Sequence, residues 1–181
     1  CIDSHDYLLI SREDGYAELE PDVIFHKTID AINGCMARSG IKRHELKGVG
    51  ISCQMHSLMC VDRQGNPLTK LIIWADTRAK KEAEYIEEKF DIWDLYKKTG
   101  SRVQHPMYPL SKILWLKNNE KKTYRKTFKF ITIKEYIISK LYGEYLIDYT
   151  LAASQGFYNI HEQDWDIFIL DNVLELEKDK F

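Results

Sequence analysis

One long amphipathic segment, residues 21–39, constrains the fold more than any other feature of this sequence. Pro21 suits the first turn of a helix, where its missing N–H costs no hydrogen bond, and Asp22 suits the positive end of the helix dipole. Gly40 can adopt the left-handed conformation that often ends a helix. The spacing predicts a helix from Pro21 to Ser39 whose apolar face consists of Phe25, Ile29, Ile32 and Met36.

Short β-branched runs follow this segment. Residues 48–52 (GVGIS), 58–61 and 71–74 are predicted as strands, and the polar sequence DRQGNP between the last two predicts the turn of a β-hairpin. Further on, Pro109 can begin a helix, and the sequence Thr132-Ile-Lys-Glu135 matches a capping box at the start of another. Helices mixed with short strands indicate the α/β class.

The composition fits one domain with a sizeable core and argues against several functions. Of the 181 residues, 44% are hydrophobic, charges of both signs are mixed, and the formal net charge is −2. No nucleic acid partner is therefore expected, and no membrane partner, because no apolar run has the roughly 18–20 residues that a span needs. Four irregularly spaced cysteines without a CxxC pair fit a reducing, cytoplasmic location.

The two ends of the sequence lead us to expect that material is missing. The chain begins at Cys1 rather than at a methionine, and no strand pattern of useful length precedes Gly15. It ends in the charged run Glu175 to Lys180. The absence of a targeting signal is therefore weak evidence. The oligomeric state stays open, with a homodimer as one alternative.

The first candidate binding segment is Gln54-Met55-His56-Ser57, directly after the glycine-rich run. Ligands in α/β proteins gather at the carboxyl ends of strands. The side chains of Gln54 and His56 can both donate and accept hydrogen bonds, which suits the hydroxyls of a polyhydroxylated ligand. The alternative is a surface histidine in a hairpin, and the spacing alone favours that alternative.

The second candidate segment is Trp74-Ala-Asp76-Thr77-Arg78. A Trp ring can pack on the C–H face of a sugar, an Asp can accept hydroxyl protons, and an Arg can bind a carboxylate through two hydrogen bonds. The alternative is a buried Trp74, an Asp76 that caps a helix and a solvated Arg78. The sequence pattern does not decide between the two.

The third candidate segment is His105-Pro106-Met107-Tyr108-Pro109, in which two prolines fix the backbone and could hold the other side chains ready for a ligand. The alternative is a rigid connector between helices. A metal site of Cys53, His56 and Cys60 is disfavoured, because a closed zinc site needs four ligands and strand alternation would separate Cys53 from His56. No Walker-type loop, GxGxxG, GxSxG or HExxH motif is present.

Together these segments resemble the N-terminal half of the FGGY carbohydrate kinases. The resemblance spans roughly Gly15 to Trp165, and its motifs occur in the family's order. They are GYAELEPD at Gly15 to Asp22, GVGISCQMHSL at Gly48 to Leu58, WADTR at Trp74 to Arg78, TG at Thr99-Gly100, KFITIKEYIISKLYGEYLIDYTLAA at Lys129 to Ala153, and QDWD at Gln163 to Asp166. One such motif would be weak evidence, whereas the ordered set is specific.

The resemblance implies a ribonuclease-H-like α/β domain, of the kind shared with actin-type ATPases, in a two-domain kinase. Residues 1–181 would be a partial N-terminal, sugar-binding domain, with ATP and Mg²⁺ bound mainly by parts absent from this chain. In the family, the positions that match Met55, His56 and Trp74 face the substrate. The expected substrate-binding residues are Gln54, Met55, His56, Trp74, Asp76, Arg78, His105 and Met107, and no metal ligand is expected.

The motifs look closest to those of gluconate kinases. Xylulose kinases more often have Gly where Ser57 stands and Asn where Ala75 stands, and glycerol kinases usually have Arg-Glu where Met55-His56 stand. The resemblance therefore implies ATP-dependent phosphorylation of a sugar acid, gluconate to 6-phosphogluconate, with Arg78 or His105 on the carboxylate. The alternatives are a xylulose-type pentulose kinase and a non-catalytic sugar-binding domain with the kinase half-fold.

The sequence departs from the family pattern in two respects. The family opens with a phosphate-gripping Asp-x-Gly-Thr hairpin, and no such motif precedes Gly15. The family's catalytic Asp lies in a later Gly-Asp segment, which this chain does not contain. Phosphoryl transfer depends on positioning and on charge neutralisation, so we expect no kinase activity from these residues alone.

Overall fold

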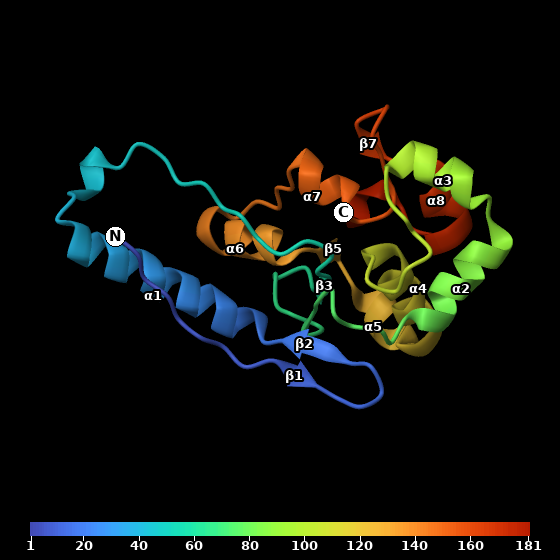
Figure 1. The fold of residues 1–181 in the computed structure, drawn as a ribbon, viewed down its shortest axis with the longest axis horizontal. Coiled ribbons are helices and arrows are strands. Elements are labelled where there is room, and N and C mark those ends of the chain that lie inside the picture. Colours follow the sequence, from blue (N-terminus) through green and yellow to red (C-terminus); the bar gives the residue numbers. More distant parts are fainter.

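The computed structural model describes all residues from Cys1 to Phe181 and shows short strands among many helices (Figure 1). The strands are β1 (Ile10–Ser11), β2 (Ala17–Leu19), β3 (Met59–Val61), β4 (Leu71–Ile72), β5 (Lys129–Ile131), β6 (Tyr158–Asn159) and β7 (Asp164–Trp165). The helices are α1 (Pro21–Ser39), η1 (Arg43–Glu45), α2 (Lys80–Lys89), α3 (Ile92–Thr99), α4 (Pro109–Asn119), α5 (Lys121–Lys126), α6 (Ile133–Tyr142), α7 (Tyr149–Ala153), α8 (Ile167–Ile169), η2 (Leu170–Leu174) and η3 (Lys178–Lys180). None of these helices is both long and apolar enough to cross a lipid bilayer.

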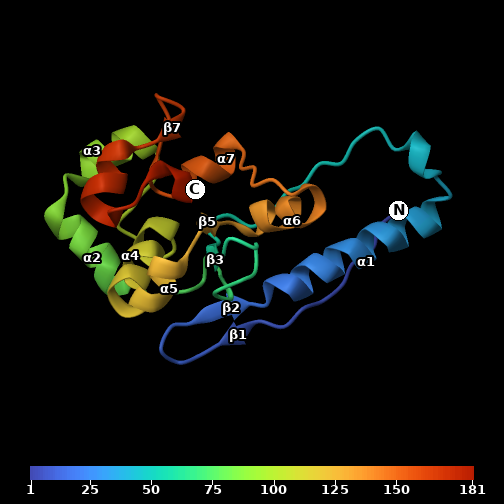
Figure 2. The same cartoon turned by 180° about the vertical axis from the view of Figure 1, so that it is seen from behind.

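The long helix α1 has the predicted ends. It begins at Pro21, and Gly40 after its last residue has a φ of 70°, the left-handed conformation. In both views α1 extends away from the other large helices, which gives the molecule its elongated shape (Figures 1 and 2). The predicted apolar face is consequently only partly covered: Ile32, for example, is 40% exposed. The first turn is anchored by the Tyr136 hydroxyl of α6, which donates to Asp22 at 2.5 Å.

The predicted hairpin is present, although its ladder is shared with other strands. Leu58 and Ile72 exchange two backbone hydrogen bonds of 2.9 and 2.8 Å, and the Asp62 carboxylate accepts two backbone N–H groups within the polar turn. The strand β3 pairs antiparallel with β5, while β4 pairs with β2, which in turn pairs with β1. The hairpin therefore joins two small sheets.

The prediction of a strand at residues 48–52 is wrong. This run has no regular secondary structure, and Val49 is 63% exposed. A β-branched run forms a strand only where a neighbouring strand accepts and donates its backbone hydrogen bonds. No described strand pairs with this run, and it passes instead as a long connection from η1 back to the body of the molecule (Figure 2).

The strands β3 and β5 lie between two hydrophobic cores. Alternate residues of a strand point to opposite faces, so Leu58 and Cys60 enter one core while Met59 and Val61 enter the other. The first core joins these residues to the helices α2, α3, α4 and η2, and the second joins them to β2, β4 and α6. The loops before β3 and after β4 are therefore attached to strands that are packed on both faces.

Local helix signals in the second half are largely confirmed, with one correction. Thr132 and Glu135 form the predicted capping box of α6, and α4 begins at Pro109. The prediction that Asp76 caps a helix is wrong, because α2 begins only at Lys80, after Ala79, and has no side-chain cap. The carboxylate of Asp76 is instead engaged in the candidate site.

Candidate functional site

The loops that carry the first two predicted binding segments meet at one buried side chain, Lys112 of α4. The Lys112 ammonium nitrogen Nζ donates to the backbone oxygen of His56 at 2.6 Å and to that of Ile73 at 2.8 Å. The third segment leads directly into α4 at Pro109. Lys112 thus joins the backbone at His56 to the backbone that precedes Trp74.

His56 is held in a defined tautomer. Its Nδ1 lies 2.8 Å from the backbone oxygen of Ser154, and because a carbonyl can only accept, Nδ1 must carry the proton. Its ring meets the ring of Tyr108 edge to face, with centroids 4.7 Å apart. Burial lowers the pKa of His56 despite the bond to Ser154, and the charges of Lys112 and His105 lower it further. The neutral ring leaves Nε2 free to accept a hydroxyl proton.

The two large apolar side chains of the first two segments, Met55 and Trp74, are open to solvent. Trp74 is 57% exposed and Met55 is 42% exposed. The alternative of a buried Trp74 is therefore wrong. Exposed apolar faces of this kind are available to the C–H groups of a ligand.

Asp76 and Arg78 form an internal charged network. Asp76 is fully buried and accepts the Ala17 N–H at 2.7 Å as well as Arg78 Nη2 at 2.7 Å. The same Arg78 nitrogen contacts Glu18 at 2.5 Å, and its guanidinium carbon lies 3.6 Å from the centroid of the Tyr16 ring. The Arg78 side chain is only 5% exposed, so the alternative of a solvated Arg78 is wrong. Their contact with a sugar stays a prediction, since both charges already have partners inside the chain.

The third segment borders a hollow of about 420 Å³, lined by Glu87, Arg102, Gln104, His105, Met107 and Tyr108. The hydrogen bond of Arg102 is made by its backbone N–H, to the Tyr108 hydroxyl at 3.3 Å, and its guanidinium has no ion-pair partner. The buried Oε1 of Gln104 has no hydrogen-bond partner. Nδ1 of His105 accepts the Met107 N–H at 3.1 Å, which leaves Nε2 as a donor in the neutral ring. The Gln104 oxygen is buried and needs a partner, whereas Arg102 and His105 are exposed and open to water or to a polar ligand.

A segment that the sequence analysis did not single out, residues 153–156, anchors the site from the opposite side. Its carbonyls accept three consecutive hydrogen bonds: Ala153 from the Ser101 hydroxyl at 2.9 Å, Ser154 from His56 at 2.8 Å, and Gln155 from the Leu110 N–H at 3.1 Å. Gly156 has a φ of 87°, and a Cβ there would lie 3.4 Å from side-chain atoms of Leu110 and Val103. A lone glycine followed by an apolar run was the signal that could have indicated this close approach.

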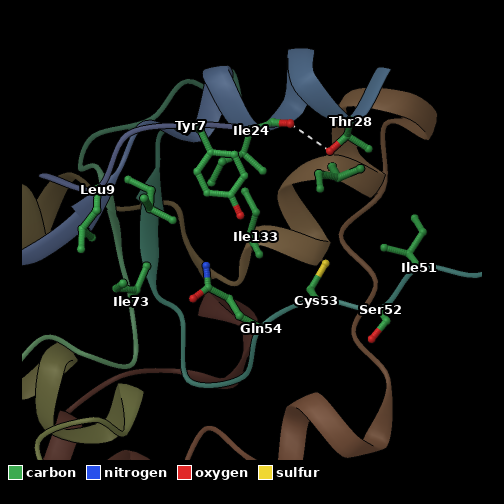
Figure 3. A pocket seen from close by; sticks show the side chains of 12 residues that line it. Tyr7, Leu9, Ile24, Thr28, Ile51, Ser52, Cys53, Gln54, Ile73 and Ile133 are labelled. Atoms are coloured by element: carbon green, nitrogen blue, oxygen red, sulfur yellow. Dashed lines mark hydrogen bonds between the residues drawn. The ribbon is translucent and has the colours of Figure 1, made fainter. Parts of the chain in front are cut away.

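Gln54 is separated from the other predicted site residues. It lines a different and mainly apolar hollow of about 510 Å³, together with residues such as Tyr7 and Ile133. The Gln54 side chain is turned toward Tyr7 in this hollow (Figure 3). Neither His56 nor Trp74 lines the hollow. A direct sugar contact for Gln54 therefore stays a prediction that the geometry does not support.

The cysteines near the site do not form a metal-binding group. No cluster of three or more His, Cys, Asp or Glu side chains lies close enough to hold a metal ion. Burial raises the pKa of Cys60 to about 12, and burial also raises the pKa of Cys53. Metal ligation requires the thiolate, which these environments disfavour.

A match to a protein-family model identifies the class of this domain. The model of the FGGY family of carbohydrate kinases, N-terminal domain, matches residues 2–181, and the chain belongs to this family. Its mixed α/β fold is that family's actin-like ATPase domain. The predicted fold class and family are thereby confirmed.

Individual relatives include kinases of two sugars. The chain is 38% identical to the gluconokinase of Bacillus subtilis over 164 residues, 91% of this chain and 31% of the relative. It is 30% identical to the xylulose kinase of Staphylococcus xylosus over 167 residues, 92% of this chain and 34% of the relative. The crystal structure of gluconate kinase from Lactobacillus acidophilus superimposes with a TM-score of 0.86 at 34% identity, covering 97% of this chain and 35% of that one. The chain thus spans about a third of the length of these relatives.

Proposed function

We propose that the complete polypeptide containing this chain is a cytoplasmic kinase that uses ATP to phosphorylate gluconate to 6-phosphogluconate, and that this chain supplies the sugar-binding half. The observation that carries the proposal is the hollow at the third segment. Arg102 and His105 offer donors there that have no acceptor within the chain, beside the unpartnered Oε1 of Gln104. The similarity to gluconate kinases supports the same substrate.

This set of groups is complementary to a sugar acid. A planar guanidinium can bind a carboxylate through two parallel hydrogen bonds, and a neutral histidine can add a third donor. The amide oxygen of Gln104 can accept a hydroxyl proton, as can the carboxylate of Glu87 on the same hollow. A neutral ketose has no carboxylate to pair with the Arg102 guanidinium, so Arg102 favours an anionic ligand.

The rest of the sugar would extend toward the exposed faces of Met55 and Trp74. The Trp74 ring can pack on the C–H side of the carbon chain, while the neutral His56 accepts a hydroxyl proton at Nε2. Met107 borders the same hollow as Arg102 and adds apolar surface. In this proposal Asp76 and Arg78 support the Trp74 loop from inside.

ATP is the phosphoryl donor and Mg²⁺ the metal in this proposal. Both are bound mainly by parts of the kinase other than this chain. The chain has no carboxylate cluster that fits Mg²⁺. Its own residues bind and orient the sugar, which is the part of phosphoryl transfer that depends on positioning.

The second candidate substrate is xylulose. It is favoured by the 30% identity to a xylulose kinase over nearly the whole chain. A pentulose has no carboxylate, so this candidate assigns no role to the free guanidinium of Arg102. A non-catalytic sugar-binding domain is the remaining alternative, and it would bind one of these sugars without phosphoryl transfer in any longer polypeptide.

Calorimetric titration of the complete polypeptide with gluconate, xylulose and glycerol tests the proposal. We expect gluconate to bind most tightly. Arg102→Leu should weaken gluconate binding about 10- to 100-fold, the equivalent of about 1.5–3 kcal/mol for hydrogen bonds to a charged group. Xylulose binding should change little. Lys97→Leu is the matched control, because it removes an exposed positive charge from α3 that does not line the hollow.

Two outcomes would contradict this assignment. Tighter binding of xylulose by the unaltered protein would replace gluconate with the second candidate. Equal effects of Arg102→Leu and Lys97→Leu would show only a general electrostatic contribution and remove the special role of Arg102. A coupled ATPase assay completes the test: the complete polypeptide should turn over ATP with gluconate, whereas the isolated 181 residues should not.

A further inference from the structure

The most buried cationic side chain of the site is Lys112, and it has no described ion-pair partner. Its side chain belongs to the fully buried core with 0% exposure. Both of its hydrogen-bond partners are neutral backbone oxygens, those of His56 and Ile73. Lysine is almost never fully buried unless it is paired. A charged amine in this buried space is therefore energetically unfavourable compared with an apolar side chain.

The surroundings of Lys112 also make its charged form unfavourable. Burial lowers the pKa of Lys112 to about 7, the buried carboxylate of Asp76 opposes that shift, and Arg78 adds to it. An apolar side chain of similar length would avoid the desolvation penalty. Packing alone does not explain an amine at this position, and the two carbonyls it joins point to a more specific role.

Those two carbonyls fix the directions of the sugar-facing side chains. The peptide group is planar, so the oxygen of Ile73 lies in the same rigid unit as the backbone nitrogen of Trp74. The oxygen held at the other end belongs to His56, which has a φ of 59°, a conformation that non-glycine residues rarely adopt. The His56 ring is held independently by the oxygen of Ser154. Lys112 thus anchors both loops at the residues nearest the proposed ligand.

We propose that Lys112 is a positioning residue that sets the spacing of the His56 loop and the Trp74 loop for the sugar. It does not touch the substrate. It acts through two backbone carbonyls. Through these hydrogen bonds, the position of α4, which follows the His105 segment, determines the positions of both loops. This inference rests on the proposed function, since it assumes that both loops contact the sugar.

The test is a double-mutant cycle on sugar affinity in the complete polypeptide. Lys112→Met keeps a long side chain and removes both hydrogen bonds, and we expect it to raise the dissociation constant and the KM for gluconate at least about 10-fold. The KM for ATP should stay within about twofold. In a Trp74→Ala background the effect of Lys112→Met should shrink to about threefold or less, because the two residues act as one unit. Lys117→Met, on the same helix, is the matched control.

The outcomes separate this inference from the function on which it rests. Failure of the unaltered protein to bind any of the three sugars overturns the proposed function. Normal gluconate binding that is unchanged by Lys112→Met, or that changes equally in both backgrounds, overturns the positioning role alone. If the Met variant does not fold, Lys112→Gln replaces it, because its side chain is one bond shorter and cannot reach both carbonyls, while its amide keeps a polar group in the same space. A folded Gln variant with wild-type affinity and KM, or failure of both variants to fold, would assign Lys112 to folding rather than to positioning.

Discussion

Replacing Arg78 with methionine tests whether this residue serves the fold or the ligand. In the structure Arg78 donates to the buried Asp76 through Nε at 2.9 Å and Nη2 at 2.7 Å, and it contacts Glu18 at 2.5 Å. Arg78→Met would leave the fully buried Asp76 carboxylate without a counter-charge. Removing one member of a buried pair costs about 3–5 kcal/mol. We therefore expect the free energy of unfolding to fall by about 4 kcal/mol and the melting temperature by about 8–16 °C.

Urea unfolding followed by tryptophan fluorescence measures this change. The variants required are Arg78→Met, Asp76→Asn and the double variant. The neutral amide introduced by Asp76→Asn could still accept the Ala17 N–H, so the double variant should be more stable than Arg78→Met alone, with a coupling of roughly 1–3 kcal/mol. The control is Arg43→Met on η1, an exposed cation without a side-chain partner, which should change stability by no more than about 0.5 kcal/mol.

The competing role predicts the opposite pattern. If Arg78 bound the sugar carboxylate, Arg78→Met would cost little stability and would weaken gluconate binding by about tenfold or more. A stability loss below about 1 kcal/mol together with such a loss of affinity would refute the structural interpretation. The carboxylate contact would then belong to Arg78 rather than to Arg102.

Three further predictions concern pH and close packing. Because burial lowers the pKa of His56, gluconate affinity measured by titration should be constant above about pH 6.5 and should fall as the pH drops through the folded pKa, where Nε2 becomes protonated. Gly156→Ala should lower the free energy of unfolding by about 2 kcal/mol in urea, because φ is 87° and the new methyl group would press on Leu110 and Val103. Burial raises the pKa of Glu135 from 4.5 to about 7, so this residue's stabilisation is complete below pH 4.5 and is lost as the pH rises to about 7. The loss is at most about 3 kcal/mol, and melting curves of Glu135→Gln should lack this slope.

Features governed by neighbouring residues were predictable from the sequence. The helix α1 has the predicted bounds because Pro21 and Gly40 each act within one turn of the helix end. The capping box at Thr132 also depends only on a residue three positions away. The motifs around His56 and Trp74 identified the two loops that meet at Lys112, although the family resemblance rather than periodicity pointed to them.

Features governed by distant residues were not predictable. The run 48–52 has the composition of a strand, but strand formation depends on a partner that no local pattern supplies. A helix cap was one alternative for Asp76, whereas its carboxylate accepts a backbone N–H from residue 17, which is 59 positions away. Lys112 lies among apolar residues of a helix, where a lysine normally indicates a solvated position. Its burial follows only from the packing of loops on both sides of α4.

Under the proposed function, the anchors of the site explain why sugar binding and phosphoryl transfer should be separable. Lys112, Ser154 and the Asp76–Arg78 pair all hold the His56 and Trp74 loops through contacts within the chain. Closure of the complete polypeptide around ATP is therefore not needed to position His56 and Trp74. When loops are already ordered before the ligand binds, little of the binding free energy is lost in ordering them. We therefore expect the isolated chain to bind gluconate within about tenfold of the complete polypeptide's affinity. A much weaker affinity would mean that the loops take their positions only when the rest of the kinase closes over them.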